Sequence, residues 1–520
     1  MPDRPCFARC TVLVSRAALA IYSETVSTRR RDTLLISPSL MSVQIFLQGK
    51  LLGIEEFLYA PAQADADQVF TGRSHWIGLL SEVLPRALLA ELGLAKVLLG
   101  SSGGGQFLLV LPDESRTAAE AFLHAAAAEI AALSGDALKL VWSVTENLGD
   151  WSDVRRRLTE AMDRRRGTPA AQGLDAAPAD ASAEDYFAKQ LGMKLRDTEM
   201  VGWSPESPGK ILPAAGKLQW TLAGPSDALP FARHAALSDD DSEPASTAEL
   251  ASRATGLETW GVLRGDVDNF GIRLRRATTI EEHIQLSVLY KQFFAGEMEV
   301  VCAMPEFWRK VAVIYSGGDD FAVYGAWDAL IGLAREIERL FHQFAAQMLK
   351  ELPGAEGKTI SMAIALAPAA DASLGAVFEE AGERLEAAKS ADKDCIWVLG
   401  RTLEWKQFAE AADLKDSLVR MTSEFGCSPQ YLRDLCGIYR ETQSKVSRRQ
   451  ARKMGGERPW RYHRRIRRIL GASRPQGSYR EYQKARTELI AELIGRSGVT
   501  VKLRPAGRVA LEWARLSAEA

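Results

Sequence analysis

The chain contains little cysteine and no long apolar run. Its six cysteines are scattered over 520 residues; only Cys6 and Cys10 lie close together, and no second pair follows that would complete a zinc site. We therefore expect free thiols in a reducing compartment, the cytoplasm. No apolar run approaches the roughly 20 residues of a membrane-spanning helix, so we expect no membrane contact.

Neither sign of charge dominates the sequence. The formal net charge is −2, with 25% charged and 47% hydrophobic residues, an ordinary globular composition with room for several domains. This balance gives no global field that favours nucleic acid, although local patches can still do so. The first forty residues place an apolar stretch before RRRD, the reverse of a signal peptide. We expect residues 1–40 to be an N-terminal extension of uncertain status ahead of Met41.

The composition changes at three later points. Residues 167–181 are rich in Ala, Gly and Pro without periodicity, which indicates a linker; SDDDSEPAST (238–247) is acidic and turn-forming, as solvated loops are. After Gly400, strand-like sequence gives way to helical patterns. These changes divide the chain into segments of about 41–166, 167–255, 256–400 and 401–520.

The segment 256–400 has a readable order of elements. TWGVLRGDV (259–267) predicts a strand, TTIEEHIQLSVLYKQFF a helix with a Thr cap, and VAVIYS and FAVYG two strands around a GGDD turn. Residues 326–350 have apolar positions at three- and four-residue spacing, and KTISMAIALAP, SLGAVFEEAGERLEAAKS and CIWVLG predict strand, helix and strand. The order βαββαβ predicts an antiparallel sheet with helices on one face, the ferredoxin-like arrangement of polymerase palms and nucleotide cyclases.

An internal repeat covers the same pattern. KVLLGSSGGGQFLLVLP (96–112) matches KVAVIYSGGDDFAVYG (310–325), and FLQGKLLGIEEFLY (46–59) matches VLRGDVDNFGIRL (262–274). The separation of the two motifs is 55 positions in the first copy and 53 in the second. We conclude that the chain holds two copies of one domain.

The two copies differ at the acidic positions. Asp266, Asp319 and Asp320 of the second copy correspond to Lys50, Gly105 and Gln106 of the first. The first copy therefore has no carboxylate at these positions, and only the second is expected to bind metal.

The three aspartates are the candidate metal ligands and catalytic residues. If the first strand and the hairpin are neighbours in the sheet, Asp266 would lie beside Asp319 and Asp320, and their repulsion would call for a cation. Mg²⁺ prefers such oxygen ligands and leaves positions for substrate phosphates, and two such ions can promote phosphoryl transfer. Gly317 and Gly318 allow a tight turn and close approach of a triphosphate.

Other residues near the motif have two interpretations each. Asp268 is either a further ligand or a structural residue that caps the turn before Asn269, and we favour the structural role. Lys389 and Lys393 either complement a helix C-terminus or contact the triphosphate, and Ser316 is a weaker candidate for phosphate or ribose contact. GGDD alone is also compatible with a plain surface turn, but the upstream GDVDN and the carboxylate-free duplicate argue against that.

These motifs resemble the large, polymerase-like subunit of type III CRISPR effector complexes, more the Csm type than the Cmr type. The resemblance is carried by GKLLGIEEF, SSGGGQFLLVLP, YFAKQLGMKLRDTEMVGW, WGVLRGDVDNFG, YSGGDDFAVYG and LGRTLEWKQFAEAADLKDSLVRM. It implies an α+β multidomain fold. The first palm, degenerate with GGGQ, would be 41–166, the linker and small inter-palm domain 167–255, the active GGDD palm 256–400, and the basic C-terminal helical domain 401–520.

The resemblance also implies an activity. In that family two facing palms hold two ATP molecules, and the GGDD palm joins them 3′→5′ with Mg²⁺ or Mn²⁺ into cyclic oligoadenylates when guide RNA pairs with target RNA. Carried over, Asp266, Asp319 and Asp320 would bind metal. The nucleotide contacts would come from Ser316, Gly317, Gly318, Asn269 and Lys389, with Lys393 as a looser match to GGDEF cyclases.

Two departures from the family pattern limit this expectation. Many members begin with a nuclease domain marked by a His-Asp pair, but none of the six histidines here is followed by Asp. We therefore expect no N-terminal HD domain and no deoxyribonuclease activity. Many members also bind zinc through paired cysteines in the inter-palm domain, and residues 167–255 contain no cysteine. We expect no zinc there.

The C-terminal segment has a basic run. From Lys445 to Arg474 there are twelve Lys/Arg and one Glu, with Trp460, Tyr462 and His463 among them. This pattern indicates a phosphate-binding surface, for RNA or else for an acidic neighbouring subunit. The implied partners are guide RNA, target RNA, a small subunit and the subunit that binds the guide 5′ end. The alternatives are a non-catalytic scaffold that anchors guide RNA, or a GGDEF-type cyclic dinucleotide synthase.

Overall fold

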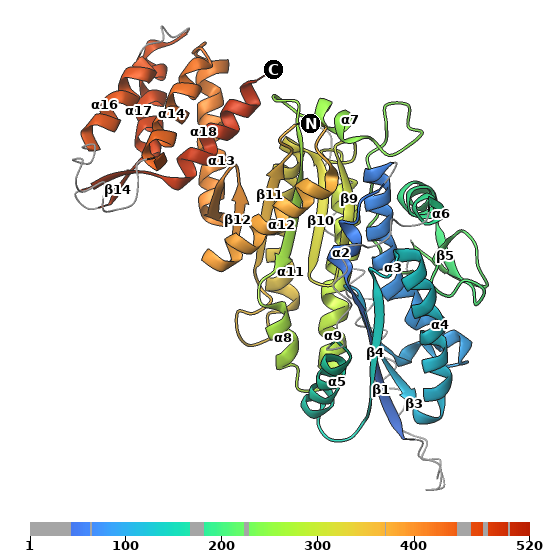
Figure 1. Cartoon of the computed structure of the whole chain (residues 1–520). Coiled ribbons are helices and arrows are strands. Elements are labelled where there is room, and N and C mark those ends of the chain that lie inside the picture. The colour runs from blue at the N-terminus through green and yellow to red at the C-terminus, as the bar shows by residue number, and fades with distance from the viewer. Residues whose placement is uncertain are drawn as a thin grey trace, which may run out of the picture. The chain divides into compact units, whose positions relative to one another are not determined.

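Two sheets with the same strand order dominate the computed structural model of the chain (Figure 1). The structure describes residues 43–62, 65–166, 181–222, 228–369, 371–444, 459–471, 477–497 and 500–519. The predicted extension 1–40, nearly all of the linker 167–181 and much of the basic run 445–474 lie outside these ranges. Within them, none of the helices combines the length and the apolar character that a membrane crossing requires.

The first sheet has four antiparallel strands in the order β2-β3-β1-β4. They are β1 (Gln44–Leu52), β2 (Leu99–Gly103), β3 (Gln106–Pro112) and β4 (Lys139–Glu146). The helices of this part are α2 (Ile54–Leu58), α3 (Ala66–Glu91), α4 (Arg116–Ser134) and α5 (Trp151–Arg166). The helix α3 is buried along most of its length, polar residues included, because other elements surround it.

The second sheet repeats this order and extends it: β13-β12-β11-β8-β10-β9. Its strands are β8 (Trp260–Val267), β9 (Val311–Gly317), β10 (Asp320–Ala326), β11 (Ile360–Leu366), β12 (Cys395–Val398) and β13 (Arg401–Glu404). The order β11-β8-β10-β9 is the ferredoxin-like order, as predicted. The sheet is not purely antiparallel, since β12 pairs parallel with β11, and β13 continues it beyond Gly400.

The register of the strands confirms the internal repeat. Lys50 lies opposite Gln106 between β1 and β3, and Asp266 lies opposite Asp320 between β8 and β10. The positions that the sequence comparison equated are thus equivalent in the two sheets.

The sequence predicts the helices of the second palm at 280–291, 327–348 and 374–391, but not those at 270–276 and 298–302. The helices of this palm are α8 (Phe270–Arg276), α9 (Ile280–Lys291), α10 (Met298–Cys302), α11 (Trp327–Met348) and α12 (Leu374–Ala391). The hydroxyl of Thr279 accepts a hydrogen bond from the backbone N–H of Glu282, which is the predicted cap of α9. Buried Leu330, Ile337 and Phe341 form the apolar face of α11.

The expectation that helices cover only one face of this sheet is wrong. Leu263 and Phe321 face a core shared with α11, whereas Val262, Ala322 and Tyr324 face a second core that α12 and the first-palm helix α3 complete. Successive strand residues point to opposite faces, and both sets are apolar here. The second palm therefore packs against the first through its sheet.

A small three-stranded sheet follows the first palm. Its strands are β5 (Met200–Trp203), β6 (Leu212–Pro213) and β7 (Leu218–Thr221), in the order β6-β5-β7. The preceding elements α6 (Ala181–Asp185), the π-helical segment η3 (Tyr186–Met193) and η4 (Lys194–Asp197) lead into it, and α7 (Thr247–Ser252) follows. The segment η3 packs along α3.

The C-terminal region is mainly helical. It contains α13 (Trp405–Ser423), α14 (Gln430–Ser444), α16 (Pro459–Gly471), α17 (Tyr479–Leu493) and α18 (Pro505–Ala518), with the hairpin β14 (Ile494–Ser497) and β15 (Thr500–Leu503). In α16, Ile466 and Leu470 are buried while Arg464, Arg467 and Arg468 are exposed.

Candidate functional site

Three aspartates meet at the adjacent ends of β8 and β10. Asp320 lies directly opposite Asp266 in the register of the two strands. The carbonyl of Asp319 accepts a hydrogen bond from the backbone N–H of Val267 at 2.9 Å, which fixes the turn against the end of β8. The structure therefore brings together the carboxylates that the sequence predicted to be neighbours.

The turn before Asp319 depends on glycine. Gly318 has a φ of +69°, a conformation that L side chains rarely adopt. Gly317 has no positive φ, and a Cβ built on it would have no heavy atom within 4 Å. The backbone at Gly317 thus borders open space beside the aspartates.

Burial and mutual repulsion raise the pKa values of the aspartates. Burial, followed by the charges of Asp320 and Asp266, raises the pKa of Asp319 to about 8. Burial and the charge of Asp266 raise the pKa of Asp320 to about 6. Burial also raises the pKa of Asp266, against the opposing effect of Lys389. Buried carboxyl groups beside one another resist ionisation unless a cation compensates their charge.

Two neighbouring side chains contact the carboxylates of Asp266 and Asp320. The ammonium group of Lys389 lies 2.6 Å from Asp266 Oδ1, and the hydroxyl of Tyr315 donates to Asp320 Oδ2 at 3.0 Å. In the described part of the chain no three His, Cys, Asp or Glu side chains are already grouped around one point as a metal site. The donor set nevertheless fits a hard divalent cation, because Mg²⁺ prefers oxygen ligands such as carboxylates.

Asp268 has the contacts of a structural residue. It is buried, and its carboxylate accepts hydrogen bonds from Thr359 Oγ1 and Ser361 Oγ, both at 2.8 Å, and from the N–H of Asp394 at 2.9 Å. These contacts agree with the structural role that we favoured.

Some of the residues predicted to contact nucleotide line one cavity with the aspartates, and others do not. Ser316, Gly317 and Gly318 all line the cavity described below, and the Ser316 hydroxyl donates to the Phe294 carbonyl. The contact of Ser316 with phosphate or ribose stays a prediction. Lys393 donates to Asn269 Oδ1, and neither residue is among those that line the cavity.

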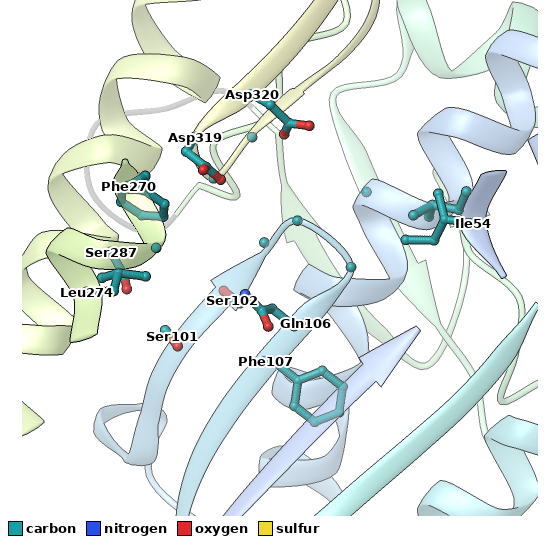
Figure 2. A pocket seen from close by; sticks show the side chains of 18 of the residues that line it. Ile54, Ser101, Ser102, Gln106, Phe107, Phe270, Leu274, Ser287, Asp319 and Asp320 are labelled. Atoms are coloured by element: carbon teal, nitrogen blue, oxygen red, sulfur yellow. The ribbon is translucent and has the colours of Figure 1, made fainter. Parts of the chain in front are cut away.

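A cavity of about 520 Å³ lies between the two palms. Asp266, Asp319 and Asp320 line it together with the GGGQ hairpin of the first palm, whose turn points toward Asp319 and Asp320 in Figure 2. The two glycine turns nearly touch, since a Cβ added to Gly318 would lie 3.9 Å from the Cα of Gly104. The catalytic candidates of one palm and the degenerate hairpin of the other thus share one space.

Sequence reasoning missed the part of the cavity wall that α5 and α9 supply. There α5 contributes Trp151 and Arg155, and α9 contributes His283 and Ser287. The Trp151 indole N–H and His283 Nδ1 are buried without a hydrogen-bond partner. No motif marks these residues in the sequence, because their neighbourhood arises only when α5 of the first palm docks on the second.

Arg155 makes that docking contact. Its guanidinium donates to the carbonyls of Leu274 at 3.0 Å and Arg275 at 2.6 Å, at the end of α8. Terminal helix carbonyls lack intrahelical partners, so a cation there is favourable.

Two families match the palms. Residues 259–397 match the family described as Cas10/Cmr2, second palm domain, and residues 43–145 match the Csm1 subunit domain B. Curated relatives agree with this assignment. The chain is similar in sequence to curated proteins named Cas10/Csm1 of CRISPR subtype III-A.

Several of these relatives are named CRISPR system single-strand-specific deoxyribonuclease Cas10/Csm1 (subtype III-A). The protein of Mycobacterium tuberculosis is 23% identical over 428 residues, covering 65% of this chain and 52% of that protein. The protein of Enterococcus italicus is 28% identical over 179 residues, covering 33% of this chain and 22% of that protein. The chain thus spans about half or less of the length of these relatives.

Solved structures share the fold. A Csm1–Csm4 cassette in complex with cA4 superposes with a TM-score of 0.66 at 17% identity, covering 92% of this chain and 70% of that one. A Csm1–Csm4 cassette in complex with one ATP gives a TM-score of 0.63 at 17% identity, with the same coverage of both chains.

Proposed function

We propose that the chain is the subunit of a type III CRISPR effector complex that converts ATP into cyclic oligoadenylates, joined 3′→5′, when target RNA is bound. The observation that carries this proposal is the pairing of Asp266 with Asp320 at a cavity that a second, carboxylate-free palm also lines. The two family matches, and neighbours solved with cA4 or ATP, support it. We expect the protein to work in the cytoplasm.

Asp266, Asp319 and Asp320 are the residues that would hold Mg²⁺ or Mn²⁺. Such ions would favour ionisation of an attacking ribose hydroxyl and stabilise the leaving pyrophosphate. Lys389 accompanies Asp266 in the site, so its ammonium group is placed to neutralise charge on a triphosphate. The open backbone at Gly317 would let phosphate oxygens approach closely.

The first palm would hold the second nucleotide. In a cyclic product each nucleotide attacks once through its 3′-hydroxyl and is attacked once at its α-phosphate, which releases pyrophosphate, so two nucleotides must lie together. The GGGQ hairpin borders the same cavity and offers small residues with no carboxylates to repel phosphate. At about 520 Å³ the cavity has the size of ordinary ligand sites, which run from roughly 300 to 1,000 Å³.

Other partners follow from the same assignment. We propose guide RNA, target RNA and the other type III subunits as partners, including a small subunit and the subunit at the guide 5′ end. Csm4 accompanies Csm1 in the structural neighbours. The exposed Arg464, Arg467 and Arg468 of α16 offer phosphate contacts, which would position RNA rather than read its sequence.

The deoxyribonuclease activity in the relatives' names is not part of this proposal. None of the six histidines of the chain is followed by Asp, so the sequence given contains no His-Asp pair on which to propose it.

The test uses the full chain in its effector complex with matched target RNA. Radiolabelled ATP with Mg²⁺ should give cyclic adenylate oligomers, and GTP should not. Asp319→Ala combined with Asp320→Ala should abolish product, whereas the exposed Asp371→Ala serves as a matched charge removal and should retain it. Cyclic dinucleotides from GTP would instead support a GGDEF-type synthase, and unchanged turnover in the double variant would support a scaffold.

A further inference from the structure

A buried ion pair joins the two palms outside the carboxylate cluster. Lys291 ends α9 of the second palm, and its ammonium group lies 2.5 Å from Glu82 Oε2 on α3 of the first palm. The two side chains are 13% and 4% exposed. Neither residue lines the cavity, so the pair does not itself reach a ligand there.

The pair also holds the degenerate hairpin. Ser102 of β2 donates to Glu82 Oε2 at 3.0 Å and accepts from Lys291 Nζ at 3.0 Å. Arg86, one turn along α3, lies 2.8 Å from the same carboxylate oxygen. Glu82 therefore faces one cation from each palm, and the Ser102 hydroxyl completes the network.

This network lies beside the point where the glycine turns meet. Gly103 follows Ser102, and a Cβ built on it would lie 3.5 Å from Glu82 Oε1 and 3.8 Å from the backbone nitrogen of Gly318. Gly103 therefore lies between the Glu82 carboxylate and the backbone of the GGDD turn. A shift of Lys291 relative to Glu82 would move the degenerate hairpin against the turn that precedes Asp319.

We propose that Glu82, Lys291 and Ser102 form a positioning network that sets the spacing of the two palms across the cavity. Buried charges tolerate little displacement, because a separated partner leaves a charge without compensation. The network therefore favours one relative placement of the hairpin and the GGDD turn. This inference rests on the proposed function, in which two nucleotides held by different palms must be aligned for reaction.

If the network aligns the two nucleotides, its loss should change the steady-state kinetics. Misplacement of reacting groups by about 1 Å can cost about 100-fold in rate. Loss of the network should therefore lower kcat, while the KM for ATP, set by contacts within each palm, should change little.

Lys291→Met tests the contact between the palms most directly. It removes the cross-palm cation but leaves Glu82 paired with Arg86 and Ser102, so the first palm keeps its own contacts. We expect kcat to fall at least about 10-fold and KM to change less than about 3-fold. Lys291→Arg keeps the charge and should restore kcat to within about 3-fold of the unmodified chain.

Lys310→Met is the matched control. It makes the same chemical change in an ion pair of the second palm, Lys310 Nζ to Asp328 Oδ2 at 3.0 Å, whose members do not line the cavity. Hydrogen exchange of the amides of residues 99–106 supplies a readout without nucleotide. Exchange should be faster in Lys291→Met than in Lys310→Met.

The outcomes separate this inference from the proposed function. If the unmodified chain in its complex makes no oligoadenylate, the proposed function fails, and the hydrogen-exchange comparison still decides whether the network holds the hairpin. If the unmodified chain is active and Lys291→Met matches Lys310→Met in kcat and in exchange, the network does not position the hairpin and the inference is wrong.

Discussion

Asp266 and Asp320 lie directly opposite each other on neighbouring strands, and the equivalent pair of the first palm is Lys50 and Gln106. The same register thus carries two different chemistries. In the second palm this position of the register carries two carboxyl groups, and in the first palm it carries none. We therefore expect only the second palm to bind cations, while the first palm keeps the shape of the hairpin.

Asp319→Asn should stabilise the chain in the presence of a chelator. Burial and the neighbouring carboxylates oppose the charge of Asp319, which is why its pKa is raised to about 8. Asparagine removes the free-energy cost of neutralising this carboxyl on folding, so the unfolding midpoint should rise by about 2 °C or more in EDTA at neutral pH. In Mg²⁺ the order should reverse, since an ion that binds only the folded state stabilises the unmodified chain more. Thermal unfolding in both conditions checks this, and equal midpoints throughout would contradict it.

Substitutions at the two glycines should separate stability from activity. Gly318→Ala places a side chain at φ +69° and should cost about 1–2 kcal/mol in unfolding free energy. Gly317→Ala meets no heavy atom within 4 Å and should leave stability unchanged, yet its methyl group would occupy space needed by a phosphate. We expect its KM for ATP to rise several-fold. Denaturant unfolding and steady-state kinetics on both variants measure the two effects, and a stable, fully active Gly318→Ala would contradict the first.

The sequence was informative where local pattern and repetition agree. The Thr279 cap follows from the local sequence at the start of α9. The strands and the Asp266–Asp320 neighbourhood follow from motifs that recur at nearly equal spacing, so this pairing could be predicted without coordinates. The link between Glu82 and Lys291 could not, because its members are 209 positions apart and belong to no motif. Polar residues on α3 look like a solvent-facing stripe until the second palm is known to cover them.

The same limit applied to the second face of the sheet in the second palm. Val262 and Ala322 are apolar, but nothing local shows that α12 and the first palm cover them. Trp151 and Arg155 likewise acquire a role only when α5 docks on α8. Long-range docking, rather than local preference, placed each of these residues.

Arg155→Met should loosen the part of the cavity wall that the end of α8 forms. The variant removes hydrogen bonds to the carbonyls of Leu274 and Arg275 and so loosens the end of α8, which carries lining residues. We expect the KM for ATP to rise about 3- to 10-fold and stability to fall by about 1–2 kcal/mol. Arg156→Met is the control, since Arg156 is 61% exposed and its ion pairs should contribute little. Indistinguishable kinetics for the two variants would contradict the assignment.

His283 should make the stability of the chain fall in mild acid. Burial, with the charge of Arg155, lowers its pKa to about 4, below the usual value of 6.5. Between about pH 6.5 and pH 4 the unfolded chain therefore binds a proton that the folded chain does not, so unfolding becomes more favourable as pH falls through that window. Below about pH 4 this contribution should level off. His283→Gln cannot take up the proton, and its unfolding free energy should depend less steeply on pH over the same window. Denaturant unfolding at pH 7, 6, 5 and 4.5 measures the two slopes, and parallel curves would show that His283 is not the residue responsible.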